Sequence, residues 1–67
     1  MKNKIEAIRK QQHITQAELA KALGVTRQTI SSLENGRYNP SIFLAHNIAQ
    51  YFHTTIEEIF IFEDDTL

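Results

Sequence analysis

The stretch "TQAELAKALGVTRQTISSLENG", residues 15–36, contains two short helical patterns with one tight joint between them. Its first half opens on a Thr-x-x-Glu capping box, in which the hydroxyl of Thr15 and the carboxylate of Glu18 can satisfy free backbone N–H groups at the start of a helix. Apolar residues then recur with helical spacing. The sequence therefore predicts a helix over residues 16–23.

The joint between the two patterns is three residues long. Gly24 fits the left-handed conformation that ends a helix, Val25 can bury its side chain beneath the turn, and Thr26 can cap the next helix. That helix is predicted over residues 27–35, with Gly36 closing it. So short a connection sets two helices at a large angle, roughly 90–120°, as in a helix-turn-helix.

The second helix of the pair has a polar face of a particular kind. Ile30 and Leu33 are its inward positions, and a helix that only filled a core would normally show Lys and Glu to water. This helix instead shows short or forked hydrogen-bonding groups: Arg27, Gln28, Thr29, Ser31 and Ser32. In a helix-turn-helix, the N-terminal part of the second helix enters the major groove of DNA. Gln can pair there with adenine, Arg with guanine or phosphate, and Ser and Thr with base edges or backbone. These side chains are therefore candidates for DNA contact.

The rest of the chain predicts three more helices, which makes the fold class all-α with five helices. The predicted ranges are residues 3–12, 42–52 and 55–60, followed by a short extended C-terminal segment. Ser41 can cap the helix after the Pro40 loop, and Thr54 with Glu57 forms a second Thr-x-x-Glu capping box. One domain is expected over residues 1–67, with a core at about 3–60 and an extended, acidic tail at 61–67.

Composition argues against several classes of protein. The 67 residues include no cysteine, which excludes disulfides and thiolate zinc sites. The N-terminus is too charged for a signal peptide, and no apolar run approaches the roughly 18 residues of a membrane helix. A cytoplasmic, nucleoid-associated location and no membrane partner are therefore expected. No serine has a convincing His and Asp partner, and His46 and His53 lie about two helical turns apart, so no catalytic residue, metal ligand or cofactor is expected.

Charge is divided along the chain. All seven Lys and Arg residues lie within the first 37 residues, so residues 1–56 carry a net charge of +4 and residues 57–67 one of −5. Such an asymmetry suggests an anionic partner for the basic part of the chain. Ordinary surface charge is the alternative explanation.

Residues 15–41 resemble the DNA-binding domain of lambda-repressor-like proteins (the Cro and repressor type, or XRE family), and the resemblance covers residues 3 to about 60. The shared pattern is Gln16, Leu19, Ala20, Gly24, Val25, Thr26, Ile30, Ser31, Leu33, Glu34, Gly36 and Pro40. This resemblance implies contacts to DNA bases from Arg27, Gln28 and Ser32, although Ser32 stands where longer side chains such as Gln also occur. It implies DNA-backbone contacts from Gln16, Thr26, Thr29, Ser31, Asn35, Arg37, Tyr38 and Asn39. It further implies that Gln16 braces the second helix and that Glu34 ties this helix to its neighbours, for example by pairing with Arg9.

The resemblance also implies a transcriptional regulator that binds double-stranded DNA, most simply a repressor that binds a palindromic operator as a homodimer. The run Ile59, Phe60, Ile61 and Phe62 is predicted to form the dimer interface, because a helix ending on a five-helix core can bury about two of four successive apolar side chains. The alternative for this run is that all four fold back onto their own core. Two other functions remain open: an antitoxin-like protein that binds a partner and autoregulates its operon, and an interaction domain that has lost DNA binding.

Overall fold

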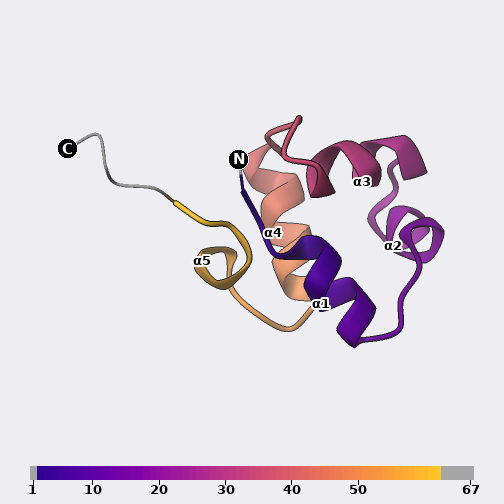
Figure 1. The fold of residues 1–67 in the computed structure, drawn as a ribbon, viewed down its shortest axis with the longest axis horizontal. Helices are drawn as coiled ribbons and strands as arrows, with labels where there is room; N and C mark the ends of the chain where they lie inside the picture. The colour runs from indigo at the N-terminus through magenta and orange to yellow at the C-terminus, as the bar shows by residue number, and fades with distance from the viewer. Residues whose placement is uncertain (1, 63–67) are drawn as a thin grey trace.

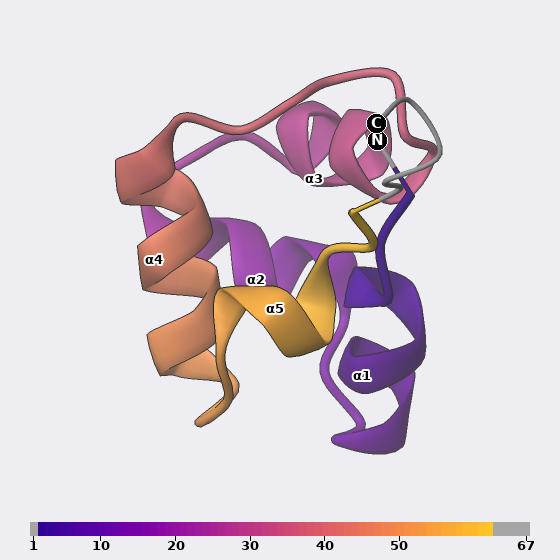
Figure 2. The same cartoon turned by 90° about the vertical axis from the view of Figure 1, so that its left-hand side faces the viewer.

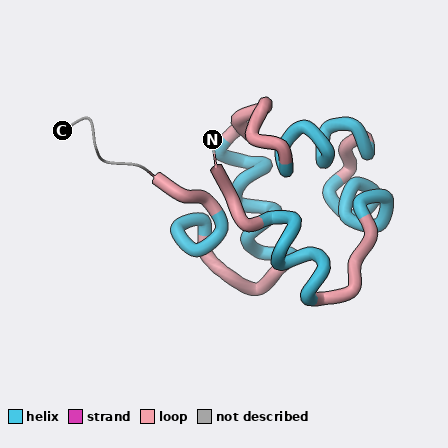
Figure 3. The backbone as a smooth tube through the Cα atoms, viewed as in Figure 1, coloured by secondary structure: helices cyan, strands magenta, loops and turns pink. Residues whose placement is uncertain are grey.

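The computed structural model describes residues 2–62 and contains, within that range, five helices and no strand. The helices are α1 (Ile5–Gln11), α2 (Gln16–Leu23), α3 (Arg27–Glu34), α4 (Ile42–Tyr51) and α5 (Ile56–Ile59). In Figure 1, α2 and α3 lie together on one side of the molecule and α5 on the other, with α1 and α4 between them. Figure 3 shows the same course of helices and loops. The predicted all-α fold with five helices is confirmed, while the acidic part of the predicted tail, residues 63–67, lies outside the described residues.

Three of the helices begin where the sequence places a hydroxyl cap. Thr15, Thr26 and Ser41 are extended, and their side-chain oxygens accept backbone N–H groups of α2, α3 and α4 at 3.0, 3.1 and 3.1 Å. The capping box of α2 is complete, because the carboxylate of Glu18 also accepts the N–H of Thr15 at 2.8 Å. These caps set the starting points of the helix pair that the sequence predicts.

The predicted capping box at Thr54 and Glu57 is wrong by one residue. Thr55 is the cap of α5, and its hydroxyl accepts the N–H of Glu58 at 3.2 Å. The N–H of Thr54 instead donates to a carbonyl of α4 at 2.9 Å, after His53 has turned the chain with a φ of 57°. Thr54 therefore closes α4, and α5 begins one residue later than predicted.

The core draws on every helix. The largest fully buried side chains are Ile5, Leu19, Ile30, Leu33, Ile48 and Ile59. Ile30 and Leu33 are the inward positions predicted for α3, and both are fully buried. Anchored by these two side chains, α3 can leave its opposite face open to solvent. None of the helices within residues 2–62 has the length and apolar character needed to span a bilayer.

The predicted dimer run from residue 59 to residue 62 divides into two halves. Ile59 and Phe60 are 0% and 3% exposed in the chain's own core, which leaves them almost no surface for the predicted dimer contact. Ile61 and Phe62 are 40% and 60% exposed. Two of the four side chains are thus buried, as the size of the core suggested. Phe60 is extended and forms an isolated antiparallel bridge with Asn3.

Candidate nucleic-acid interface

The connection between α2 and α3 has the tight geometry that the sequence predicts. Gly24 is left-handed with a φ of 72°, and a Cβ atom added there would meet no heavy atom within 4 Å, so the backbone conformation rather than crowding favours glycine. The N–H of Val25 donates to the carbonyl of Ala20 at 3.0 Å, which completes the turn. Thr26 then caps α3 directly. These three residues turn the chain sharply, so α3 crosses α2 at the edge of the molecule (Figure 1).

The polar face of α3 consists of two rows of side chains. Arg27 and Ser31 lie four residues apart in one row, and Gln28 and Ser32 lie four residues apart in the next. Arg27 and Gln28 are exposed, while Ser31 and Ser32 are half-buried. The longer side chains therefore stand at the N-terminal end of α3, which is the end that enters the major groove in a helix-turn-helix.

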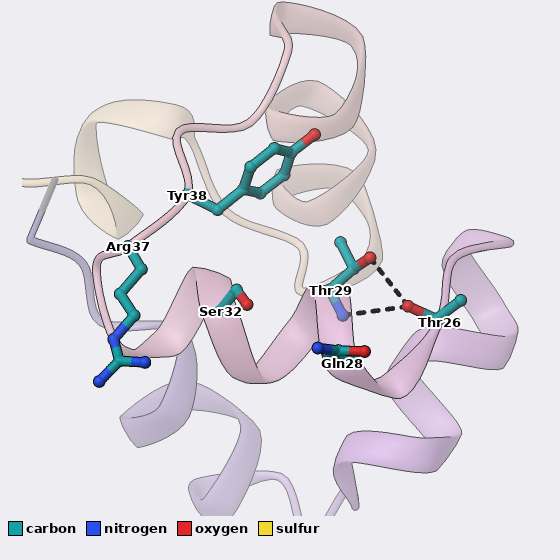
Figure 4. A pocket seen from close by; sticks show the side chains of 6 residues that line it. All are labelled: Thr26, Gln28, Thr29, Ser32, Arg37 and Tyr38. Atoms are coloured by element: carbon teal, nitrogen blue, oxygen red, sulfur yellow. Dashed lines mark hydrogen bonds between the residues drawn. The ribbon is translucent and has the colours of Figure 1, made fainter.

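Beside the second row, the surface is hollowed over a volume of about 400 Å³. The hollow brings together six of the predicted contact residues from the cap of α3, its outer face and the loop that follows: Thr26, Gln28, Thr29, Ser32, Arg37 and Tyr38. Figure 4 shows Tyr38 standing over α3 from the loop, and Arg37 at the opposite end of the helix from Thr26. The hollow thus combines hydrogen-bonding groups, one cation and an aromatic ring, which is the chemistry needed to bind a phosphate or the edge of a base.

Two hydroxyls in this hollow are joined to each other. The Oγ1 atoms of Thr26 and Thr29 lie 2.9 Å apart, and the same oxygen of Thr26 accepts the backbone N–H of Thr29 at 3.1 Å (Figure 4). The two hydroxyls share one hydrogen between them, so the second hydrogen stays available as a donor. A donor at the N-terminus of a helix is suited to a phosphate oxygen. Sequence reasoning identified both threonines but not their contact.

A buried charged network anchors the C-terminal end of α3. The guanidinium of Arg9 reaches Glu34 through Nε at 2.7 Å and Nη2 at 3.3 Å, and its Nη1 donates to the carbonyl of Ile14 at 2.9 Å. Gln16 donates its amide to the same carboxylate at 2.9 Å. The side chains of Arg9 and Glu34 are 9% and 4% exposed. The predicted pairing of Arg9 with Glu34 is confirmed, and Gln16 contacts the end of α3.

This network also decides the charge that α3 presents to solvent. The pKa of Arg9 is raised, chiefly by its hydrogen bond to Glu34 and against the opposing effect of burial, so the guanidinium stays charged. Glu34 is the one acid in α3, and it is paired inside the protein. The outer face of the helix and the loop after it are left with the cations Arg27 and Arg37, which favour an anionic partner.

Other predicted site residues lie outside the hollow but on the same helix, its bracing network or the following loop. The first row contains Arg27 and Ser31, and the network with Arg9 and Glu34 contains Gln16. Asn35 and Asn39 are exposed in and beyond the last turn of α3. Within the part of the chain that the structure describes, no three His, Cys, Asp or Glu side chains come together as metal ligands. The predicted DNA-contact residues therefore lie on α3 and its cap, on the glutamine that braces it, or in the loop that follows it.

This fold and surface define a helix-turn-helix DNA-binding domain. A family model described as helix-turn-helix matches residues 5–59, and the chain belongs to this family, in its lambda-repressor-like branch. Over 65 residues the chain is 54% identical to an uncharacterised HTH-type transcriptional regulator of Methanocaldococcus jannaschii, a match that covers 97% of this chain and 98% of the relative.

Two further similarities concern a phage protein and a solved structure. The chain is 37% identical over 46 residues to the immunity repressor protein of Bacillus phage phi105, covering 69% of this chain and 32% of that protein. A chain of the SinR protein/SinI protein complex matches with a TM-score of 0.77 and 26% identity; the match covers 94% of this chain and 62% of that one. The protein is therefore a helix-turn-helix transcriptional regulator and not an enzyme.

Proposed function

We propose that this regulator is a repressor that binds an inverted-repeat operator as a homodimer and reads each half-site with α3. The observation that carries the proposal is that α3 exposes a polar face to solvent while a buried network of Arg9, Gln16 and Glu34 holds the helix in place. Gln28 and Arg27 stand exposed at its N-terminal end, while Glu34 holds the other end to α1 and α2. A reading helix must be held rigidly, because a bidentate contact to a base tolerates little misplacement.

The expected contacts differ in kind along this surface. Gln28 is suited to adenine N6 and N7, and Arg27 to guanine or phosphate. Thr26, Gln16 and the loop residues Arg37 and Tyr38 are suited to phosphate contacts, which position the protein without reading sequence. Two copies on an inverted repeat double the number of base contacts, with half-site centres about 34 Å apart. A dimer bound to such a site at a promoter blocks access of RNA polymerase, so repression of transcription is the simplest function. The protein is then expected at the nucleoid, where the DNA is. The phi105 relative, named an immunity repressor, supports this choice.

The proposed dimer contact, called here the apolar face, is built around Ile42 and Phe62, which are 75% and 60% exposed, and it includes their exposed sequence neighbours Phe43 and Ile61, which are 79% and 40% exposed. Ile42 and Phe62 line one hollow of about 250 Å³ between α4 and α5, and the residues that line this hollow include no charged side chain. A fully buried aromatic side chain removes about 150–250 Å² from water, and an isoleucine removes somewhat less. Because these four side chains are already partly covered, two copies that bury all of them bury on the order of 1,000 Å². That area is near the lower limit of a specific interface and predicts a dimer that depends on concentration.

DNA selection from a random pool tests the DNA-binding half of the proposal. We expect the enriched sites to share an inverted repeat. Gln28→Ala should then lose discrimination by about 1–3 kcal/mol at one base pair of each half-site, with stability almost unchanged because the side chain is exposed. Gln11→Ala, which removes an exposed glutamine of α1, is the matched control and should bind as the parent does. An enriched pool without a repeat, or equal binding by both variants, would contradict the docking.

Sedimentation equilibrium tests the dimer. Ile42→Lys adds a charge to the apolar face and should shift the protein to monomers, whereas Ala7→Lys adds the same charge to the exposed side of α1 and should leave the association unchanged. A wild-type chain that stays monomeric in solution and on its operator would rule the homodimer out. The apolar face would then be open to a different protein, as in the antitoxin-like alternative.

A further inference from the structure

The carbonyl of Leu33, in the last turn of α3, receives a hydrogen bond from the beginning of the chain. The side-chain amide Nδ2 of Asn3 donates to this oxygen at 2.7 Å. The N–H of Gly36 donates to the same oxygen at 3.1 Å as the chain leaves the helix. Asn3 therefore contacts the point at which α3 turns into the loop that carries Arg37 and Tyr38.

The amide of Asn3 has one orientation that satisfies both Leu33 and Ile5 as hydrogen-bond partners. Its Oδ1 accepts the N–H of Ile5, the first residue of α1, at 3.1 Å. The partner on the other side is the carbonyl of Leu33, which can only accept. The nitrogen must therefore face Leu33 and the oxygen must face Ile5. This arrangement links the start of α1 to the end of α3 through a single side chain.

The backbone on both sides of Asn3 is paired with the last residue of α5 and with the segment that follows it. The N–H of Lys4 donates to the carbonyl of Ile59 at 2.8 Å, and the N–H of Ile61 donates to the carbonyl of Lys2 at 2.9 Å. Figure 2 shows the N-terminal segment running between the end of α3 and the extended residues after α5. Asn3 is thus held in place by backbone pairing that does not involve its side chain.

We infer that Asn3 is a positioning residue for DNA binding, an inference that rests on the function proposed above. Its bond to Leu33 sets the direction in which the chain leaves α3 and so places Arg37 and Tyr38 beside the phosphate backbone. The N-terminal end of α3 is fixed by the turn at Gly24, and the Arg9–Glu34 pair holds the side of its last turn. The bond from Asn3 acts on the backbone itself, one residue before Glu34 and four before Arg37.

Asn3→Ser isolates this bond. Serine keeps an oxygen near the N–H of Ile5 and leaves the backbone pairing intact, but its side chain is too short to reach Leu33. Ile48→Val is the control for a general loss of stability, because it trims a fully buried side chain of α4. All comparisons are made at a temperature at which both variants are fully folded by circular dichroism.

Two measurements decide the inference. Hydrogen exchange by NMR should show protection of the Gly36 and Arg37 amides falling about five-fold in Asn3→Ser relative to Ile48→Val, as expected for one lost hydrogen bond. Affinity for the selected operator and for unrelated DNA should fall by a similar factor, because the contacts that depend on the loop read no sequence. In an Arg37→Ala background, Asn3→Ser should reduce DNA affinity by a smaller factor than it does in the wild type, because the two residues act on the same phosphate contact.

Each failure has its own meaning. Unchanged protection of Gly36 and Arg37 would overturn the positioning role, whatever the protein binds. A changed exchange pattern with DNA affinity equal to that of the parent, or with effects that add fully to those of Arg37→Ala, would also overturn it. If the wild-type chain selects no DNA, the proposed function fails, and the exchange measurement alone still decides whether Asn3 orders the loop.

Discussion

Removal of Arg9 should destabilise the protein far more than removal of any exposed cation. Arg9→Met leaves an apolar chain of similar length, but the carboxylate of Glu34, 4% exposed, loses both guanidinium contacts and keeps only the amide of Gln16. Breaking a buried pair by removing one partner typically costs about 3–5 kcal/mol. A domain of this size has a total stability of roughly 3–10 kcal/mol, so the variant should be close to unfolding at 25 °C.

Urea unfolding followed by circular dichroism measures this loss. With a slope of about 1 kcal/mol per molar urea for so small a domain, the midpoint should fall by about 3–5 M, or the variant should be unfolded without urea. The double variant Arg9→Met/Glu34→Met removes both charges and should recover most of the loss, because no uncompensated carboxylate remains buried. Lys10→Met is the matched control. It breaks the pair with Glu6, whose N–O distance is 3.0 Å but whose side chains are 66% and 54% exposed, and it should cost less than about 0.5 kcal/mol.

The reasoning fails if Arg9→Met lowers the free energy of unfolding by less than about 1 kcal/mol. It also fails if the double variant loses as much of this free energy as Arg9→Met and Glu34→Met lose together. The first result would mean that water reaches Glu34 in the folded protein. The second would mean that the packing of both side chains, rather than the charge of either, supports α3.

Three shorter predictions concern the loop, the cap of α2 and the end of α4. Arg37→Ala should weaken binding to all DNA sequences alike and reduce the slope of log affinity against log salt by about one, and a loss confined to the operator would reassign Arg37 to base reading. The pKa of Glu18 is lowered, first by the hydrogen bond from the backbone of Thr15, so the stability it contributes is present above its unfolded pKa and is lost as pH falls through the folded value. Glu18→Gln should therefore flatten the fall in Tm between about pH 5 and pH 3, and an unchanged pH profile would contradict the capping box. His53→Gly should raise stability by about 0.5–1 kcal/mol, because His53 is left-handed with a φ of 57°, whereas His46→Gly inside α4 should lower it by about as much.

Much of the fold could be predicted because its signals are local. The hydroxyl of Thr15 lies three residues before Glu18, and Gly24 needs only its own backbone freedom to turn the chain. The polar face of α3 follows from the helical period once Ile30 and Leu33 are taken as its inward side. These features depend on residues within one or two helical turns, so the sequence carries them without knowledge of the core.

The cap of α5 shows where local signals become ambiguous. Thr54 and Thr55 each have a glutamate three residues later, so both satisfy the same capping pattern. The choice between them depends on His53, which closes α4 with the N–H of Thr54, and on the burial of Ile59 in the core. Packing against the rest of the molecule therefore selects Thr55, and no short pattern could have done so.

Taken alone, the sequence determined the helix pair, its tight joint, the polar face of α3 and the presence of surplus apolar residues after α5. Only the tertiary structure decided which of those residues are buried, because the position of Phe60 depends on its antiparallel bridge with Asn3 at the other end of the chain. It alone also joined Asn3 to the end of α3 and brought Tyr38 over the hollow beside Gln28. The physical reason is the same in each case: hydrogen bonds and contacts between distant segments have no period along the chain, and they exist only once the core has brought those segments together.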